Sequence, residues 1–191
     1  MILIPLALIL LRLALGPFSI ALALGGASRW IFALILVAGL LSDIYDGVLA
    51  RKLGVDRAWL RRFDSVTDAI FYFCIIATAF IVAKPVMMGG LVPVLCLVVL
   101  ELAGNALSLV KFGVLPATHC YSAKLYGIAL FISSIAVLSL GAGSWILWGL
   151  LAFGVLSNTE TLAVLWLASE NPVDVKSIIY LLRSRTKKHP S

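Results

Sequence analysis

Charged residues are scarce in this sequence. Only 13% of its 191 residues are Asp, Glu, Lys or Arg, and nine of these are acidic. A soluble domain usually carries about 25% charged and about 45–50% apolar residues, whereas 62% of this chain is hydrophobic. Its three cysteines and two histidines show no spacing typical of a zinc site, so the cysteines are expected to be buried thiols. The composition therefore excludes an ordinary soluble domain.

Long apolar runs recur along the chain, and each could cross a bilayer as a helix of about 20 residues. Six spans are predicted, with approximate limits 2–24, 30–50, 64–83, 86–110, 123–141 and 144–168. The first span lacks a basic leader, so it is expected to be retained. The predicted fold is an all-α polytopic membrane protein with one six-span domain over residues 1–170. Residues 171–191 are predicted to form an amphipathic, basic tail.

The basic residues fall mostly on one side of the predicted membrane. On that side lie Arg51, Lys52, Arg57, Arg61, Arg62, Lys111, Lys124, Lys176, Arg183, Arg185, Lys187 and Lys188. The opposite side has Arg29 and Lys84. The positive-inside rule therefore predicts that both termini are cytoplasmic. Because the cations lie at membrane boundaries, the net charge of +6 argues for anionic lipid and against nucleic acid as the partner.

Four aspartates stand around the turn between the second and third spans. Asp43 and Asp46 are three residues apart near the end of one span, and Asp64 and Asp68 are four apart in the first two predicted turns of the next. Each spacing places both side chains on one helix face. Because the two helices are antiparallel neighbours, the four acids are expected to converge near the cytoplasmic surface.

Converging carboxylates repel one another, and a charged acid at mid-membrane costs about 2.5–3.5 kcal/mol. Three explanations are open: protonation, salt bridges to Arg51, Arg61 or Arg62, or bound cations. Two divalent cations would cancel four charges, and carboxylate oxygens favour Mg²⁺, Mn²⁺ or Ca²⁺ over zinc. A salt-bridge network without chemistry also fits the acids taken alone.

The residues beside the acids favour a phosphate ligand. Gly47 and Ala50 leave the helix surface bare, and Arg51 adds a cation that can hold a phosphate through two hydrogen bonds. Acids for metal, a bare surface and an arginine together predict a diphosphate substrate.

At these residues the sequence resembles the CDP-alcohol phosphotransferase family, whose signature is D-x2-D-G-x2-A-R-x8-G-x3-D-x3-D. The matching residues are Asp43, Asp46, Gly47, Ala50, Arg51, Asp64 and Asp68. Leu60 stands where the family has its second glycine, and it is expected to crowd a nucleotide that needs open backbone there. The segment LILLRLALGP, with Arg12, resembles the first span of phosphatidylglycerophosphate synthases, and SAKLYG, with Lys124, also resembles the family.

The resemblance implies transfer of a phosphatidyl group from CDP-diacylglycerol to an alcohol, with release of CMP and with two divalent cations, Mg²⁺ or Mn²⁺. It implies that Asp43, Asp46 and Asp64 ligate metal, and that Asp68 both touches metal and acts as general base. It implies a CDP site formed by Asp43, Gly47, Ala50 and Arg51. The active site is expected to face the cytoplasm from the cell inner membrane, and the family suggests a possible homodimer.

Three further cations have two interpretations each. Lys124 and Lys111 could hold the phosphate of an acceptor such as glycerol 3-phosphate or an inositol phosphate, or they could be snorkelling anchors. Arg12 lies well inside the first span, where an unpaired arginine is expensive, so it is expected to face the bundle or a polar cavity.

Two alternative functions remain open from the sequence. A UbiA-type intramembrane prenyltransferase also uses aspartate-rich motifs with Mg²⁺, but it has more spans and its motifs lie in separate loops. A divalent-cation transporter would use the acids, but it leaves Gly47 and Arg51 unexplained.

Overall fold

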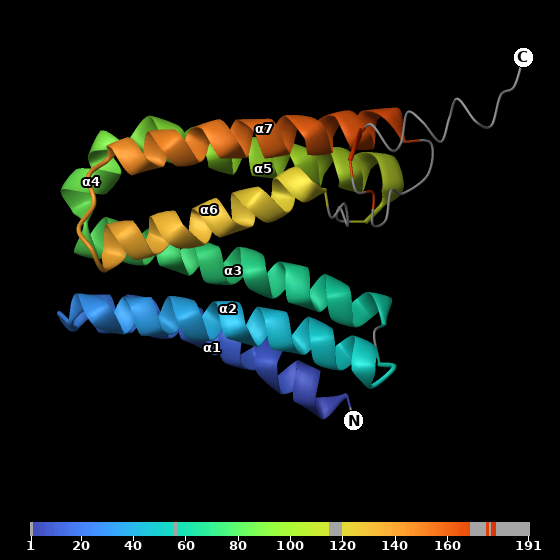
Figure 1. Ribbon diagram of the computed structural model, residues 1–191, viewed down its shortest axis with the longest axis horizontal. Coiled ribbons are helices and arrows are strands. Elements are labelled where there is room, and N and C mark those ends of the chain that lie inside the picture. Colours follow the sequence, from blue (N-terminus) through green and yellow to red (C-terminus); the bar gives the residue numbers. More distant parts are fainter. Residues whose placement is uncertain (1, 56, 115–119, 169–174, 176, 179–191) are drawn as a thin grey trace, which may run out of the picture. The chain divides into compact units, whose positions relative to one another are not determined.

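The computed structural model describes residues 2–55, 57–114, 120–168, 175, 177 and 178. These residues form helices and no strand (Figure 1). The helices are α1 (Leu3–Leu24), α2 (Arg29–Lys52), α3 (Ala58–Val82), α4 (Lys84–Gly89), α5 (Leu91–Phe112), α6 (Tyr121–Leu138) and α7 (Trp145–Leu167). Six of them, all except α4, are long and apolar enough to cross a membrane. The predicted all-α, six-span fold is therefore confirmed.

Two predicted boundaries differ from the structure. Helix α3 begins at Ala58, well before residue 64, because Arg61 and Arg62 are good helix formers that end an apolar run without ending a helix. Asp64 and Asp68 therefore lie about two and three turns from the start of α3. The predicted span 86–110 is split, with α4 ending at Gly89 and α5 beginning at Leu91.

The chain divides into two compact units. One combines Met1–Met88 with Ser134–Gly143, and the other combines Gly89–Ser133 with Ser144–Ser191. Arg12 and the four aspartates belong to the first unit, whereas Lys111 and Lys124 belong to the second. The predicted tail, residues 171–191, lies outside the described residues except at positions 175, 177 and 178.

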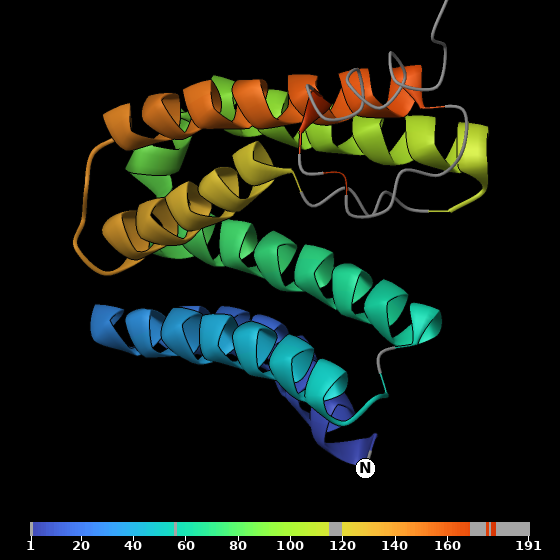
Figure 2. The same ribbon diagram turned by 45° about the vertical axis from the view of Figure 1, so that its right-hand side comes forward.

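Helix α1 packs against both α2 and α3 in the first unit, and it lies largely behind α2 in the two ribbon views (Figures 1 and 2). Small residues allow the close approach that membrane helices favour. A Cβ added at Gly16 would stand 3.2 Å from the Cβ and Sγ of Cys74 on α3. One turn further on, the hydroxyls of Ser19 and Thr78 are hydrogen-bonded at 2.8 Å. These contacts hold α1 and α3 in a fixed register.

The link between α2 and α3 is a tight, glycine-dependent turn. Gly54 has a φ of +64°, and its N–H donates to the carbonyl of Arg51 while that of Val55 donates to the carbonyl of Ala50. This is the Schellman arrangement, which uses a left-handed glycine to end a helix. Val55 packs against a buried cluster formed by Ile9, Ala50 and Leu60. The turn therefore folds back onto α1 and directs the start of α3 towards the end of α2.

Glycines also permit close packing in the second unit, where α5 packs against α7. A Cβ at Gly154 on α7 would stand 2.0 Å from the Leu97 side chain, and a Cβ at Gly90 would stand 2.2 Å from that of Leu147. The break between α4 and α5 therefore lies where the backbone must approach the start of α7. This contact is the physical reason for the split of the predicted span.

Polar contacts join the ends of helices in the same unit. The carboxylate of Glu160 on α7 accepts hydrogen bonds from the hydroxyl of Ser122 on α6 and, at 3.1 Å, from the backbone N–H of Ile178. Cys120 is buried just before α6, its thiol donates to the carbonyl of Val175 at 3.3 Å, and burial raises the pKa of that thiol. The α6–α7 pair is thus tied to the chain that follows α7.

Large apolar side chains cover the outer faces of the helices. Leu34 on α2 and Leu156 on α7 are 69% and 61% exposed, as expected of surfaces that contact lipid in an integral membrane protein. The expectation of buried thiols is wrong for Cys96, which is exposed on α5. An apolar run does not distinguish an inward-facing from a lipid-facing position, because both are apolar.

Candidate active site

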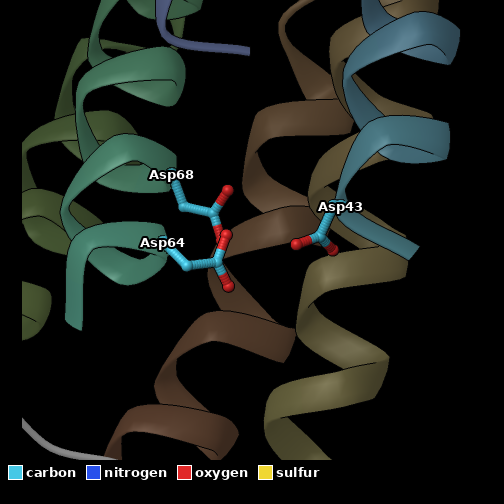
Figure 3. Close-up of side chains that lie close together, drawn as sticks. All are labelled: Asp43, Asp64 and Asp68. Atoms are coloured by element: carbon cyan, nitrogen blue, oxygen red, sulfur yellow. The ribbon is translucent and has the colours of Figure 1, made fainter. Parts of the chain in front are cut away.

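Three of the four aspartates meet between α2 and α3. Asp43 comes from α2, Asp64 and Asp68 come from α3, and their carboxylates point towards one another (Figure 3). One oxygen from each lies within 4.8 Å of the other two. Helices α2 and α3 both pack against α1 and are joined through the Gly54 turn, and three of the four acids come together as the sequence predicted.

Arg12 of α1 reaches into this cluster. Its side chain is 1% exposed, and its Nη1 lies 3.0 Å from Asp43 Oδ1 and 3.1 Å from Asp64 Oδ1 and donates also to Asp68 Oδ1. Its Nη2 donates to Asp46 Oδ2. The structure confirms that Arg12 faces the bundle interior. Its guanidinium is ion-paired with all four acids.

The partner of the acids is the main feature that the sequence interpretation missed. The salt-bridge hypothesis named Arg51, Arg61 and Arg62, which are near the acids in sequence, whereas the structure supplies Arg12 from a different helix. The signal was present, because an arginine in mid-span requires a buried anionic partner. Combining this requirement with the four acids would have identified the pairing.

Asp46 occupies a different place from the other three acids. Its side chain is 4% exposed, against 44% for Asp43, 29% for Asp64 and 37% for Asp68. It contacts the far nitrogen of Arg12 and is not part of the three-carboxylate group. Of the four predicted ligands, three are therefore converging carboxylates, and the fourth is a buried carboxylate that contacts the other terminal nitrogen of Arg12.

The three converging carboxylates fit a divalent cation. Opposite ligands on one Mg²⁺ lie about 4 Å apart, given Mg–O distances of about 2.0–2.1 Å, and the three oxygens here lie within 4.8 Å of one another. All donors are hard oxygens, which suit Mg²⁺ or Mn²⁺. Four carboxylates around one guanidinium also leave a formal surplus of three negative charges. The donor set and the charge both suit added cations.

Arg51 lies over Gly47 at the end of α2. A Cβ placed on Gly47 would be 3.6 Å from Arg51 Nη1 and 3.8 Å from Nη2. The position has only ordinary van der Waals contact with a flexible guanidinium. Gly47 and Arg51 are therefore neighbours on the surface of α2, one turn beyond Asp43.

Ala50 and Leu60 are packed in the protein core. Ala50 is 6% exposed and Leu60 is 3% exposed, and they contact each other and Ile9 in one cluster. The leucine that replaces the family glycine therefore fills space against α1. Ala50 supports the turn from within, whereas the sequence interpretation placed it in the CDP site.

A small cleft opens beside the acids. It is lined by Arg12, Gly39, Leu40, Asp43, Asp68, Phe71 and Tyr72. A Cβ at Gly39 would stand 2.7 Å from the Phe71 ring, so the absence of a side chain there gives the ring its position. Asp43 and Asp68 are thus reachable from a partly apolar cleft.

The two lysines predicted for the acceptor have different surroundings in the second unit. Lys111 Nζ donates to the carbonyls of Leu165 at 2.9 Å and Trp166 at 2.6 Å, so it caps the last turn of α7. Lys124 Nζ lies 5.7 Å from the centroid of the Tyr121 ring, within the range of a cation–π contact. These contacts give Lys111 a structural role.

Six apolar helices, with an acidic cluster carried by α2 and α3, define an integral membrane protein with a polar site. The family model described as CDP-alcohol phosphatidyltransferase matches residues 2–156, which include Arg12 and all four aspartates. The chain therefore belongs to the CDP-alcohol phosphatidyltransferase family. Its members are transferases of substituted phosphate groups in phospholipid synthesis, and they typically use divalent cations. No curated protein and no solved structure shows a significant match to the chain.

Proposed function

We propose that this enzyme transfers the phosphatidyl group of CDP-diacylglycerol to a small phosphorylated alcohol, in the manner of phosphatidylglycerophosphate synthases. The family membership supports the transferase class and replaces the two alternatives, a prenyltransferase and a cation transporter. The observation that carries the proposal is the convergence of Asp43, Asp64 and Asp68 beside a cleft. The carboxylates outnumber the single positive charge of Arg12, which suits the binding of further cations.

The acidic and basic side chains of the site have different roles. Asp43, Asp64 and Asp68, with Asp46 behind them, hold two divalent cations, Mg²⁺ or Mn²⁺. Asp68 also takes the proton from the acceptor hydroxyl, because its side chain is 37% exposed and lines the cleft. Arg51, over the bare surface of Gly47, holds the diphosphate.

The reaction is a displacement at phosphorus. The acceptor oxygen attacks the phosphorus that carries the diacylglycerol, the bond from that phosphorus to the CMP oxygen breaks, and CMP leaves. Bound divalent cations supply neutralisation of charge on the transferred phosphoryl group and the leaving oxygen. The chain contributes Asp68 as the base and Arg51 as the residue that binds the diphosphate. Leu40 and Phe71 form an apolar wall of the cleft.

The chemistry of the substrate suits this location. CDP-diacylglycerol has its diphosphate at the membrane surface, its acyl chains in the bilayer and its nucleotide in water. We place the site on the cytoplasmic side of the inner membrane, because the basic residues flank the end of α2 and the start of α3. Lys124 is the better of the two acceptor lysines, since Lys111 already caps α7.

The test is CMP release by the purified full-length protein in lipid nanodiscs. CDP-diacylglycerol, Mn²⁺ or Mg²⁺ and one alcohol at a time are supplied, with glycerol 3-phosphate, inositol phosphate, inositol and serine as the panel. We expect metal-dependent CMP release with a phosphorylated alcohol and formation of the matching phospholipid. The proposal would be contradicted if none of these acceptors supported CMP release, or if EDTA left the release unchanged.

Replacing Arg51 by lysine should impair use of the nucleotide substrate. Lysine keeps the charge but loses the two-pronged contact that arginine makes with phosphate. Loss of one charge-assisted hydrogen bond is worth about 1.5–3 kcal/mol, so kcat/KM for CDP-diacylglycerol should fall about ten-fold or more.

The matched control is Arg57→Lys, an exposed arginine at the residue before α3. It should leave kcat/KM unchanged. Equal kinetics for the Arg51 variant and wild type would remove Arg51 from the diphosphate site.

A further inference from the structure

The guanidinium of Arg12 stands where the three carboxylates converge. Its Nη1 alone contacts the Oδ1 atoms of Asp43, Asp64 and Asp68. These residues are the same three whose oxygens lie within 4.8 Å of one another. A single nitrogen surrounded by three carboxylate oxygens has the surroundings that a bound cation has. Arg12 therefore occupies the centre of the candidate metal site.

Arg12 cannot serve all these oxygens fully. Each terminal guanidinium nitrogen carries two hydrogens, whereas Nη1 faces three carboxylates. One positive charge also faces four carboxylates. Arg12 therefore holds the cluster together, but its Nη1 has fewer hydrogens than it has carboxylate neighbours.

A divalent ion bound by the same three oxygens would compete with Nη1 for its position. The ion needs oxygens at about 2.0–2.1 Å for Mg²⁺, and Nη1 lies about 3 Å from two of those oxygens. The two cations would also repel each other at this short separation. Nη1 must therefore withdraw before the ion can take all three ligands.

We propose that Arg12 is an internal counter-cation that competes with divalent ions for Asp43, Asp64 and Asp68 and so sets the metal affinity of the enzyme. Asp46 gives the displaced side chain an anchor, because it contacts Nη2 and lies outside the three-carboxylate group. Ser42 offers a second one, since its Oγ lies 3.4 Å from Nε. The proposal rests on the metal-dependent function proposed above, and it adds a role for a residue on α1.

The experiment measures Mn²⁺ affinity directly, without turnover. Free Mn²⁺ is followed by electron paramagnetic resonance during titration of the full-length protein in nanodiscs. The variants are Arg12→Gln and Arg12→Lys, and the control is Arg29→Gln, an arginine outside the acidic cluster. We expect Arg12→Gln to bind Mn²⁺ at least ten-fold more tightly than wild type, and Arg12→Lys to lie between them, because lysine lacks the fork that reaches both Nη positions. The control should match wild type.

Thermal unfolding gives a second readout. Without metal, Arg12→Gln should unfold at a lower temperature than wild type, because four carboxylates lose their counter-ion, and Mn²⁺ should raise its unfolding temperature by more than it raises that of wild type. A glutamine variant that folds only with Mn²⁺ and is lost on chelation supports the proposal. If that variant does not fold even with Mn²⁺, the Mn²⁺ affinity and the unfolding temperature of Arg12→Lys test the proposal in its place.

The outcomes separate this inference from the proposed function. Mn²⁺ affinity that is equal or weaker in the folded Arg12 variants overturns the competition and leaves the metal site intact. Failure of folded wild type and variants alike to bind Mn²⁺ overturns the metal site, and with it the proposed function.

Discussion

Asp68→Asn should lower the rate of CMP release by about 10²–10⁴-fold, the usual contribution of a general base. Asparagine keeps the size of the side chain and an oxygen that can contact metal, but it cannot take up a proton from the acceptor. Arg12 retains three carboxylate partners in this variant, so the α1–α2–α3 packing should persist. The measurement is steady-state CMP release at saturating CDP-diacylglycerol and Mn²⁺.

Two observations decide whether Asp68 is the base. The loss should remain when Mn²⁺ is raised, because the missing function is proton transfer. Glu101→Gln, the same chemical change at an exposed residue of α5, should leave the rate near that of wild type. A folded Asp68→Asn protein that releases CMP at the wild-type rate would exclude Asp68 from this role.

Asp64→Asn should act mainly through metal affinity. Asp64 supplies one of the three converging oxygens, and even outer-shell partners of a metal typically contribute 10–100-fold to affinity, so loss of a direct ligand should weaken Mn²⁺ binding by at least about 100-fold. At low Mn²⁺ the variant should therefore be nearly inactive. Its activity should return in large part as the Mn²⁺ concentration rises.

Comparison of the two variants distinguishes metal ligation from proton transfer. Activity that responds to added Mn²⁺ in Asp64→Asn but not in Asp68→Asn assigns metal ligation to Asp64 and proton transfer to Asp68. If Asp64→Asn shows wild-type Mn²⁺ affinity in the titration, the three-carboxylate group is not the metal site.

The helices were predictable because their cause is local. An apolar run longer than a bilayer is thick has one stable form in a membrane, which is a helix. The ends of the helices were less predictable. The early start of α3 at Ala58 depends on helix-compatible charged residues, and the break at Gly90 depends on the approach of Leu147 from α7. The second cause is a contact between distant segments, which hydropathy does not record.

As with the helices, the parts of the site that depend on local sequence were predictable, and the parts that depend on contacts between distant segments were not. The i,i+3 and i,i+4 spacings of the aspartates put each pair on one face, and the short link between the helices made the pairs meet. The pairing of Arg12 with the acids required knowledge that α1 packs beside both helices. The burial of Ala50 depends on Leu60, because a leucine fills a space that the family glycine would leave open.

The Gly54 turn has an energetic consequence for ligand capture. Its two backbone hydrogen bonds and the packing of Val55 against the Ile9, Ala50 and Leu60 cluster leave residues 53–55 few torsional degrees of freedom. The separation of the two aspartate-bearing helices is thereby set before any ion arrives, so little conformational entropy is lost on binding. The backbone that carries the aspartates is in this sense preorganised at the turn. Selectivity among ions then depends on rotations of the aspartate side chains.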